Sequence, residues 1–213
     1  MGVTRYLTIA RNGGAEVEVK RSRFLCTLER VTDEGSARAV VDRLRKQHWD
    51  ARHHCSAFVL GAGGPSGVVE RSSDDGEPAG TAGAPMLEVL RGHQVSDVVA
   101  VVSRWFGGTL LGAGGLVRAY GDAVRLALVD TGTLTRELVR ELTIDVDHAD
   151  AGRAESELRN RGVAVLGTTY AARVSLRVGV TPDEEPRLHA LVSELTAGAT
   201  VAVPSGESWV DRR

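Results

Sequence analysis

A continuous apolar run near the middle of the chain limits the possible folds more than any other feature. The run is Val98 to Val102, with the sequence VVAVV. Successive side chains of a strand point to opposite faces, so a strand without polar alternation has to be covered on both sides. The sequence therefore predicts a central strand at 98–102 that is buried on both faces.

A glycine-rich loop follows this strand and precedes the clearest helix of the chain. The loop reads GGTLLGAGG over 107–115, and apolar residues at helical spacing predict a helix over 116–130. Glycine turns before a helix can present backbone N–H groups to an anion. The loop lacks the Lys and Ser/Thr of a phosphate-binding P-loop and the dinucleotide spacing Gly-x-Gly-x-x-Gly. Two interpretations stay open: close packing with a positive-φ turn, or binding of phosphate or RNA backbone.

The remaining pattern predicts an α+β protein of two domains, 1–133 and 134–213. Alternating apolar residues predict strands in the first domain, and spacing of three and four predicts helices. The second domain reads βαββαβ, which is the ferredoxin-like order. The predicted strands are 16–19, 24–28, 57–60, 68–71, 98–102, 142–146, 163–170, 172–180 and 200–203, and the helices are 36–48, 85–90, 116–130, 149–161 and 181–196.

Composition excludes several classes of protein. With 42% hydrophobic and 25% charged residues, the chain resembles an ordinary soluble globular protein. No apolar run approaches the ~18 residues of a membrane span, and the amino terminus lacks a signal-peptide pattern. We therefore expect a cytoplasmic protein that does not bind membranes. A net charge of −2 indicates no overall basic field for nucleic acid, and sequence-specific DNA binding is not expected.

An acidic loop is the second candidate for chemistry. The segment SSDDGEP over 72–78 carries Asp74, Asp75 and Glu77 within four positions. These carboxylates can ligate a hard cation such as Mg²⁺, or they can hold backbone N–H groups in Asx-type turns. Turn formation is the favoured interpretation, so no metal or other cofactor is expected.

Two further segments carry polar groups that can act in a site. In His53-His54-Cys55, strand alternation predicts that His53 and Cys55 share one face and that His54 points away. A structural role is favoured over ligand binding or catalysis. Arg104 and Trp105 follow the buried strand, and an Arg beside an aromatic ring suits stacking on bases.

Taken together, four segments resemble the YigZ/IMPACT family over roughly residues 16–130. They are KRSRF at 20–24, ARHHCSA at 51–57, SSDDGEPAGTAG at 72–83, and VVSRWFGGT with LGAGGLVRAY across 101–120. Trp105 stands where the family usually has tyrosine. The second domain resembles the small ferredoxin-like domain of bacterial members.

The resemblance implies a fold, a function and a set of binding residues. The first domain is expected to resemble the second domain of small-subunit ribosomal protein five, and the second domain to resemble domains of elongation factor G. Eukaryotic relatives regulate translation initiation through a general-control kinase. They do so with an amino-terminal partner-binding domain that is not expected here. The candidate binding residues are Arg23, His53, His54, Cys55, Ser73, Asp74, Asp75, Glu77, Thr81, Arg104, Trp105, Gly107, Gly108, Gly112 and Gly115.

Three functions are compatible with these features. The first is a non-enzymatic regulator that binds RNA, the ribosome or a translation factor through loops 72–84 and 103–115. It would need a local basic patch, for which the candidates are Lys20, Arg21, Arg23, Arg52, Arg71 and Arg104. The alternative is a metal-dependent hydrolase that uses the three acidic residues with His53 or His54. The third is a protein–protein adaptor. The sequence does not indicate an oligomeric state.

Overall fold

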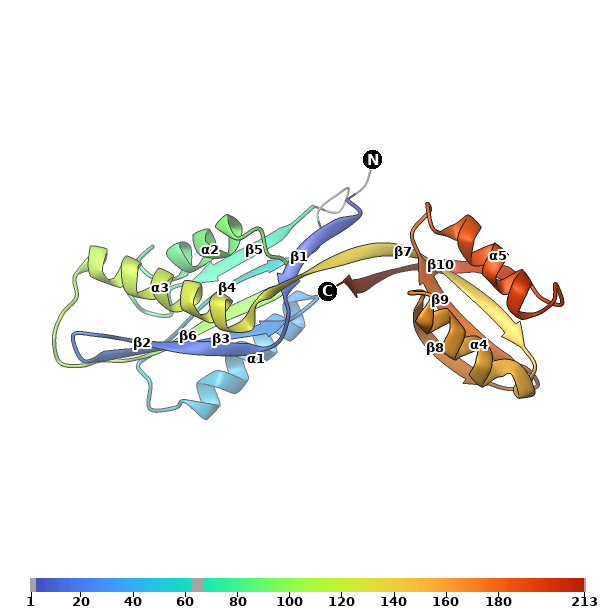
Figure 1. The fold of residues 1–213 in the computed structure, drawn as a ribbon. Coiled ribbons are helices and arrows are strands. Elements are labelled where there is room, and N and C mark those ends of the chain that lie inside the picture. Colours follow the sequence, from blue (N-terminus) through green and yellow to red (C-terminus); the bar gives the residue numbers. More distant parts are fainter. Residues whose placement is uncertain (1–2, 63–66, 213) are drawn as a thin grey trace. The chain divides into compact units, whose positions relative to one another are not determined.

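A computed structural model describes residues 3–62 and 67–212 of the chain (Figure 1). Its contacts divide the chain into two compact units, a first that ends at Thr135 and a second that spans Arg136–Arg212. Each unit has its own hydrophobic core. Both units mix helices and strands, as the sequence predicts. The sequence GAGGPSG at 61–67 predicts a loop, but its residues 63–66 lie outside the described residues.

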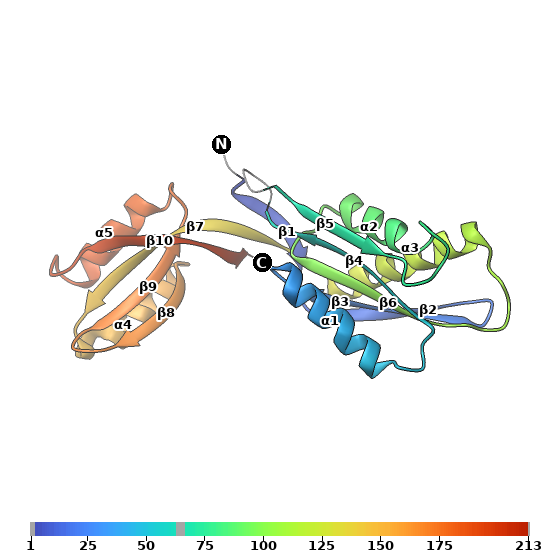
Figure 2. The ribbon, with the colours of Figure 1, turned by 180° about the vertical axis from the view of Figure 1, so that it is seen from behind.

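One five-stranded antiparallel sheet forms the centre of the first unit. Its strand order is β2-β3-β6-β4-β5, and every neighbouring pair runs antiparallel. Two helices cover one face of this sheet, and α1 covers the other (Figures 1 and 2). The elements are β1 (Arg5–Ile9), β2 (Gly13–Val19), β3 (Ser22–Arg30), α1 (Glu34–Gln47), β4 (His53–Leu60), β5 (Val69–Ser73), α2 (Gly83–Gly92), β6 (Val98–Trp105) and α3 (Ala113–Thr131).

The central strand β6 is buried on both faces, which confirms the prediction for 98–102. Val98, Ala100 and Val102 pack into the core beneath α2 and α3. Val99 and Val101 point the other way, into the cluster that includes Leu44 of α1. Burial on both faces is typical of parallel sheets, but here an antiparallel sheet is covered by helices on both sides.

Several element boundaries differ from those that the pattern predicts. The strand β1 was not predicted, β4 begins at His53 rather than residue 57, and α3 begins at Ala113 rather than residue 116. Helix α1 begins directly after Asp33. The Asp33 carboxylate accepts from the Ser36 N–H at 2.8 Å, so Asp33 is the cap.

The second unit has the predicted βαββαβ order of elements. In its sheet β9 lies between β7 and β8, and β10 pairs with β7. The strands and α5 surround a core that includes Leu142, Leu176 and Leu188. The elements are β7 (Thr133–Val146), α4 (His148–Asn160), β8 (Ala164–Tyr170), β9 (Val174–Val180), α5 (Glu185–Leu195) and β10 (Ala202–Arg212). The division into two domains with the bounds 1–133 and 134–213 stays a prediction.

The turn between β2 and β3 packs closely against the glycine loop that follows β6. Lys20 and Arg21 form this turn, and both have a positive φ, of 48° and 65°. The Gly107 N–H donates to the Ser22 Oγ at 3.1 Å. A Cβ on Gly107 would lie 2.0 Å from the carbonyl carbon of Arg21. Only glycine therefore allows this loop to contact the hairpin tip so closely.

We predict opposite effects of two alanine substitutions in the same loop region. Gly107→Ala forces backbone atoms apart, so it should lower the free energy of unfolding by more than about 2 kcal/mol. Gly114→Ala adds a methyl group in the first turn of α3, where no atom lies within 4 Å, so it should raise stability by about 0.5–1 kcal/mol. Urea unfolding of both variants measures this. Equal stability of the two would contradict the packing described here.

Candidate functional site

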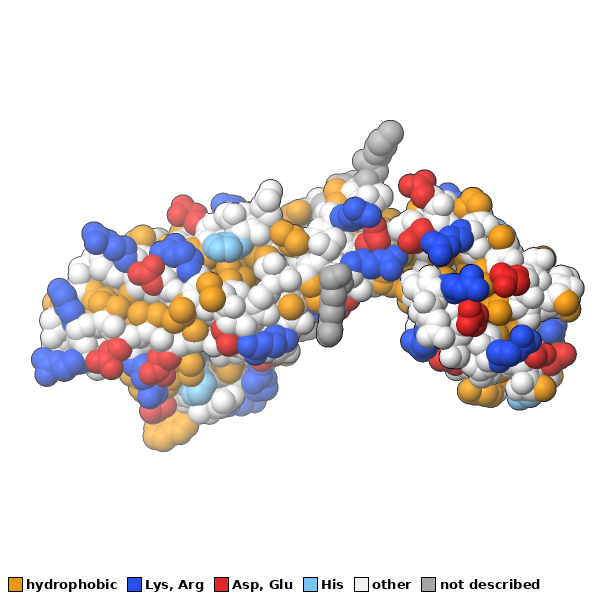
Figure 3. All heavy atoms as spheres, viewed as in Figure 1, with side chains coloured by type: hydrophobic (Ala, Val, Ile, Leu, Met, Phe, Trp, Pro, Cys, Tyr) orange, Lys and Arg blue, Asp and Glu red, His pale blue; other side chains and the backbone are white. Residues whose placement is uncertain are grey.

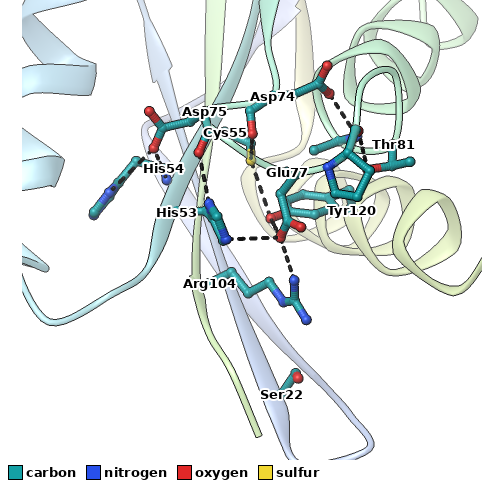
Figure 4. A network of polar contacts seen from close by, with 12 residues as sticks. Ser22, His53, His54, Cys55, Asp74, Asp75, Glu77, Thr81, Arg104 and Tyr120 are labelled. Atoms are coloured by element: carbon teal, nitrogen blue, oxygen red, sulfur yellow. Dashed lines mark hydrogen bonds and ion pairs between the residues drawn. The ribbon is translucent and has the colours of Figure 1, made fainter. Parts of the chain in front are cut away.

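A buried carboxylate, Glu77, is the centre of a polar network in the first unit (Figure 4). Its Oε1 accepts hydrogen bonds from Arg104 Nη1 at 2.5 Å and from the Tyr120 hydroxyl at 2.8 Å. The His53 Nε2 lies 4.0 Å from the same oxygen. The side chain of Glu77 is 4% exposed and that of Arg104 7% exposed, so this ion pair is shielded from water.

Four different segments supply these groups. Glu77 comes from loop 72–84, and Tyr120 comes from α3. His53 and Arg104 are cross-strand partners in the β4–β6 pairing. The network therefore ties the acidic loop to the sheet and to α3.

The three residues His53, His54 and Cys55 divide between two faces of β4, as predicted. The His53 Nδ1 lies 2.8 Å from the Asp75 carbonyl oxygen, and the Cys55 Sγ lies 3.3 Å from the Tyr120 hydroxyl. The His54 Nε2 instead lies 3.1 Å from the His48 carbonyl oxygen at the end of α1.

The chemistry of Cys55 argues against a catalytic role. Burial raises the pKa of the Cys55 thiol to about 12, and the nearby carboxylates act in the same direction. A nucleophilic cysteine needs a lowered pKa, because the thiolate is the reactive form. Cys26 is fully buried in the core, and burial raises the pKa of its thiol as well.

The acidic loop uses its carboxylates to hold its own backbone. The Asp74 carboxylate accepts from the N–H groups of Gly80, Ala82 and Gly83, at 2.8 to 3.0 Å. Burial alone would raise the pKa of Asp74, but these three hydrogen bonds hold it below its ordinary value. The favoured interpretation, an Asx-type structural loop, describes Asp74 correctly.

The other polar residues of this loop are also engaged. Asp75 accepts from the His54 N–H at 2.6 Å and from Arg45 Nη2 at 3.0 Å. The Thr81 hydroxyl donates to the Pro78 carbonyl at 2.6 Å, and the Ser73 Oγ accepts from the Asp75 N–H at 3.4 Å. Within residues 3–62 and 67–212, no three His, Cys, Asp or Glu side chains gather closely enough to hold a metal ion. The carboxylates expected in a metal-dependent hydrolase thus contact backbone, arginine and tyrosine.

An open cavity of about 410 Å³ lies where the two predicted loops meet. Its lining includes the polar side chains of Arg52, His53, Glu77 and Arg104 and the apolar side chains of three leucines and Phe106, which we call its polar and apolar sides. The lining residues are Arg52, His53, Gly76, Glu77, Pro78, Arg104, Phe106, Leu110, Leu111, Gly112, Ala113 and Leu116. Of the predicted binding residues, His53, Glu77, Arg104 and Gly112 line it. The others do not: Arg23, His54, Cys55, Ser73, Asp74, Asp75, Thr81, Trp105, Gly107, Gly108 and Gly115.

The glycines of loop 103–115 serve different purposes. Gly108 and Gly112 have a positive φ, of 85° and 72°, and a Cβ on either would meet no atom within 4 Å. They satisfy a backbone conformation that glycine favours. A Cβ on Gly115 would lie 3.0 Å from the Leu111 Cβ, so close packing explains that position.

Aromatic and basic groups gather at the same end of the sheet, on the α1 side and thus opposite the cavity. The Arg23 guanidinium lies over the Trp105 ring, 3.8 Å from its centroid, and His48 packs edge-on against the same ring at 5.5 Å. Trp49, which follows α1, is 81% exposed. Nothing in the local sequence pattern marks Trp49, Phe106 or the position of Arg52 in the cavity lining.

The basic patch expected from the sequence forms only in part. Arg104 is buried against Glu77, and Arg71 on β5 lies 3.6 Å from Glu34 in an exposed ion pair. Lys20, Arg21 and Arg52 are exposed, and within the described chain their side chains form no ion pair. Of the expected patch, these three residues are without an ion pair in the described part of the chain, while Arg23 Nε lies 3.7 Å from the Glu16 carboxylate in an exposed pair.

Stability should depend on pH through His54. Burial lowers the pKa of this imidazole below its ordinary value of 6.5, so the folded state favours the neutral form. The unfolded chain then binds more protons, and this stabilisation is complete above about pH 6.5 and is lost as the pH falls. We predict that the free energy of unfolding in urea falls between about pH 8 and pH 5. His54→Gln should make this dependence on pH less steep. If the free energy of unfolding of the variant depends on pH as steeply as that of the unmodified protein, groups other than His54 cause the dependence.

Comparisons with known proteins place this geometry in a family. The model of the Impact N-terminal domain matches residues 20–128, and a domain of unknown function (DUF1949) matches residues 144–199. None of the helices in the described residues is long and apolar enough to cross a bilayer.

The similarity extends over most of the chain. IMPACT family member YvyE of Bacillus subtilis is 40% identical over 91% of this chain and 88% of its own length. IMPACT family member YigZ of Escherichia coli is 39% identical over 85% of this chain and 89% of its own length. A crystal structure of a hypothetical protein covers 94% of this chain and 97% of its own, with 36% identity and a TM-score of 0.63. On the evidence of both its motifs and these matches, the chain belongs to the IMPACT family.

Proposed function

We propose that this protein is a translation-associated regulator that binds RNA through one end of its first unit, where β3 and β4 begin and β6 ends. This end carries the hairpin tip Lys20–Arg21 and Arg52, with Arg23, Trp105 and the exposed Trp49 on the α1 side of the sheet and the cavity between loops 72–84 and 103–115 on the other side; we call it the loop face. Family membership and the expected likeness of the first unit to ribosomal protein five support this role. The second unit, with its βαββαβ order and β9 between β7 and β8, suits a ferredoxin-like domain of the elongation factor G type.

The observation that carries the proposal is the stacking of Arg23 on Trp105 beside exposed, unpaired cations. Proteins that bind single-stranded RNA combine aromatic side chains, on which bases stack, with cations that contact phosphates. Here Arg23 stacks on the ring of Trp105, and Trp49, which is 81% exposed, lies three residues before Arg52 in the sequence. A local arrangement of this kind can bind RNA although the whole chain has a net charge of −2.

The backbone of the hairpin tip supports the same conclusion. A two-residue turn with positive φ at both positions normally carries Asn-Gly, because other residues are strained there. Lys20 and Arg21 occupy this conformation, which is less stable than a right-handed one by about 1–2 kcal/mol per residue. Strain of this kind is concentrated at functional sites. Two cations are thus held in an unfavourable conformation at the point where loop 103–115 contacts the hairpin.

The test is a variant that improves the turn and removes the cations. We predict that Lys20→Asn combined with Arg21→Gly raises the stability of the protein, because Asn-Gly suits this turn. The same variant should weaken binding of a single-stranded RNA oligonucleotide and reduce the slope of log K against log salt by about 1.4, for two lost phosphate contacts. Fluorescence anisotropy over a salt series measures both the affinity and the slope.

A control of equal charge separates a local contact from a general field. Arg153→Gln with Arg187→Gln removes two exposed cations from the second unit. This control should leave RNA affinity within about twofold. Equal losses in both variants, or no binding of the unmodified protein at low salt, would contradict the proposal.

A further inference from the structure

We propose that the cavity in the loop face is a pocket for a single nucleotide. It would hold the phosphate between Arg104, Arg52 and the amino end of α3, and the base against the apolar side. The ligand class is a nucleoside monophosphate, either free or as the terminal nucleotide of an RNA. If the ligand is the terminal nucleotide of an RNA, the inference rests on the proposed RNA-binding function; if the ligand is a free nucleotide, it does not.

Arg104 is the first observation that indicates a ligand. Its side chain lines the cavity although it is 7% exposed. Within the described residues its guanidinium uses Nη1 for Glu77, and its buried Nε has no hydrogen-bond partner. The guanidinium carbon lies 5.3 Å from the Phe24 ring centroid and 5.7 Å from that of Phe106. The Nη2 of the same guanidinium forms no hydrogen bond within the described residues and, unlike Nε, is not enclosed, so an anion in the cavity would supply it with an acceptor.

The amino end of α3 is the second observation, and it is independent of the first. Gly112 is the cap residue and has no side chain to accept from the first N–H groups, and the first turn contains no acidic residue. Those N–H groups have no partner within the helix, and a helix of 19 residues carries a partial positive charge at this end. Gly112 and Ala113 line the same cavity as Arg104.

Space at this helix end is kept open by glycine. A Cβ on Gly114 would meet no atom within 4 Å, and its φ is not positive. Neither packing nor backbone conformation therefore requires glycine at this position, which lowers helix stability relative to alanine. The absence of a side chain leaves the N–H groups accessible to an oxyanion.

The charges around the cavity favour an anion. Glu77 is the one carboxylate among the lining residues, and its charge is compensated by Arg104 and by the Tyr120 hydroxyl. Arg52 forms no ion pair within the described chain, so it adds an uncompensated cation. Together with the partial charge of the helix end, Arg52 gives the polar side a net positive character.

The apolar side suits a base. Phe106 is 42% exposed and Leu110 83% exposed, while Leu111 and Leu116 complete the wall. Covering exposed apolar side chains with a planar ring removes them from water, and an aromatic side chain can stack on any base. The volume of about 410 Å³ lies within the usual range of small-ligand pockets, about 300–1,000 Å³.

The closing experiment titrates the full chain with AMP, adenosine and inorganic phosphate by calorimetry. AMP should bind at least about tenfold more tightly than either part, because both sides of the cavity contribute. Ala113→Asp places a carboxylate at the phosphate position. It should weaken AMP binding about tenfold or more while leaving the thermal midpoint unchanged or higher, since acids stabilise helix amino ends.

The matched control is Ala149→Asp, at an exposed position in the first turn of α4 in the second unit. It changes the net charge equally and should leave AMP binding unaffected. An absence of AMP binding up to about 10 mM, or equal effects of both aspartates, would overturn the pocket. Neither result would affect the proposed function, which is tested by RNA affinity of the hairpin variant.

Two RNA oligonucleotides distinguish the sources of the nucleotide. If the terminal nucleotide of RNA is the ligand, 5′-phosphorylated RNA should bind more tightly than 5′-hydroxyl RNA, and Ala113→Asp should abolish the difference. If the two RNAs bind equally while Ala113→Asp still weakens AMP binding, the pocket takes the free nucleotide. Failure of all RNA to bind, with AMP binding retained, would remove the proposed function and leave the nucleotide pocket.

Discussion

The ion pair between Glu77 and Arg104 is the interaction on which the candidate site depends. Its geometry joins the acidic loop, the central strand and α3, because the same Glu77 oxygen also accepts from Tyr120. A buried pair of charges is stable only when both partners are present, and removal of one leaves the other uncompensated, at about 3–5 kcal/mol. The substitution of Arg104 by alanine therefore tests folding as much as binding, and exposed residues are the better probes of function.

This interaction also separates the two interpretations of the acidic loop. Three carboxylates within four positions can hold a cation or organise a turn, and both uses leave the same signature in the sequence. In the structure Asp74 accepts three backbone N–H groups, and Asp75 and Glu77 meet arginines. The loop is thereby shaped by its own charges, and of the cations expected in the basic patch, Lys20, Arg21 and Arg52 form no ion pair within the described residues.

The sequence pattern predicts features that depend only on residues adjacent in the sequence. The burial of 98–102 on both faces and the opposite directions of His53 and His54 follow from alternation alone. The burial of Arg104 does not, because its partner is remote in sequence and meets it only through the fold. Trp49 and Phe106 are similar cases: a single aromatic residue carries no periodic signal, so its exposure is known only from the structure. The strand β1 was missed because it is short and its alternation is weak.

The central claim is that RNA lies on the loop face. Ultraviolet cross-linking of a bound single-stranded RNA, followed by mass spectrometry of the peptides, tests it most directly, because aromatic side chains stacked on bases cross-link readily. The account predicts cross-links in the peptides that contain Trp49 and Trp105, and none in the peptides of α4 and α5. Cross-links confined to the second unit would contradict it.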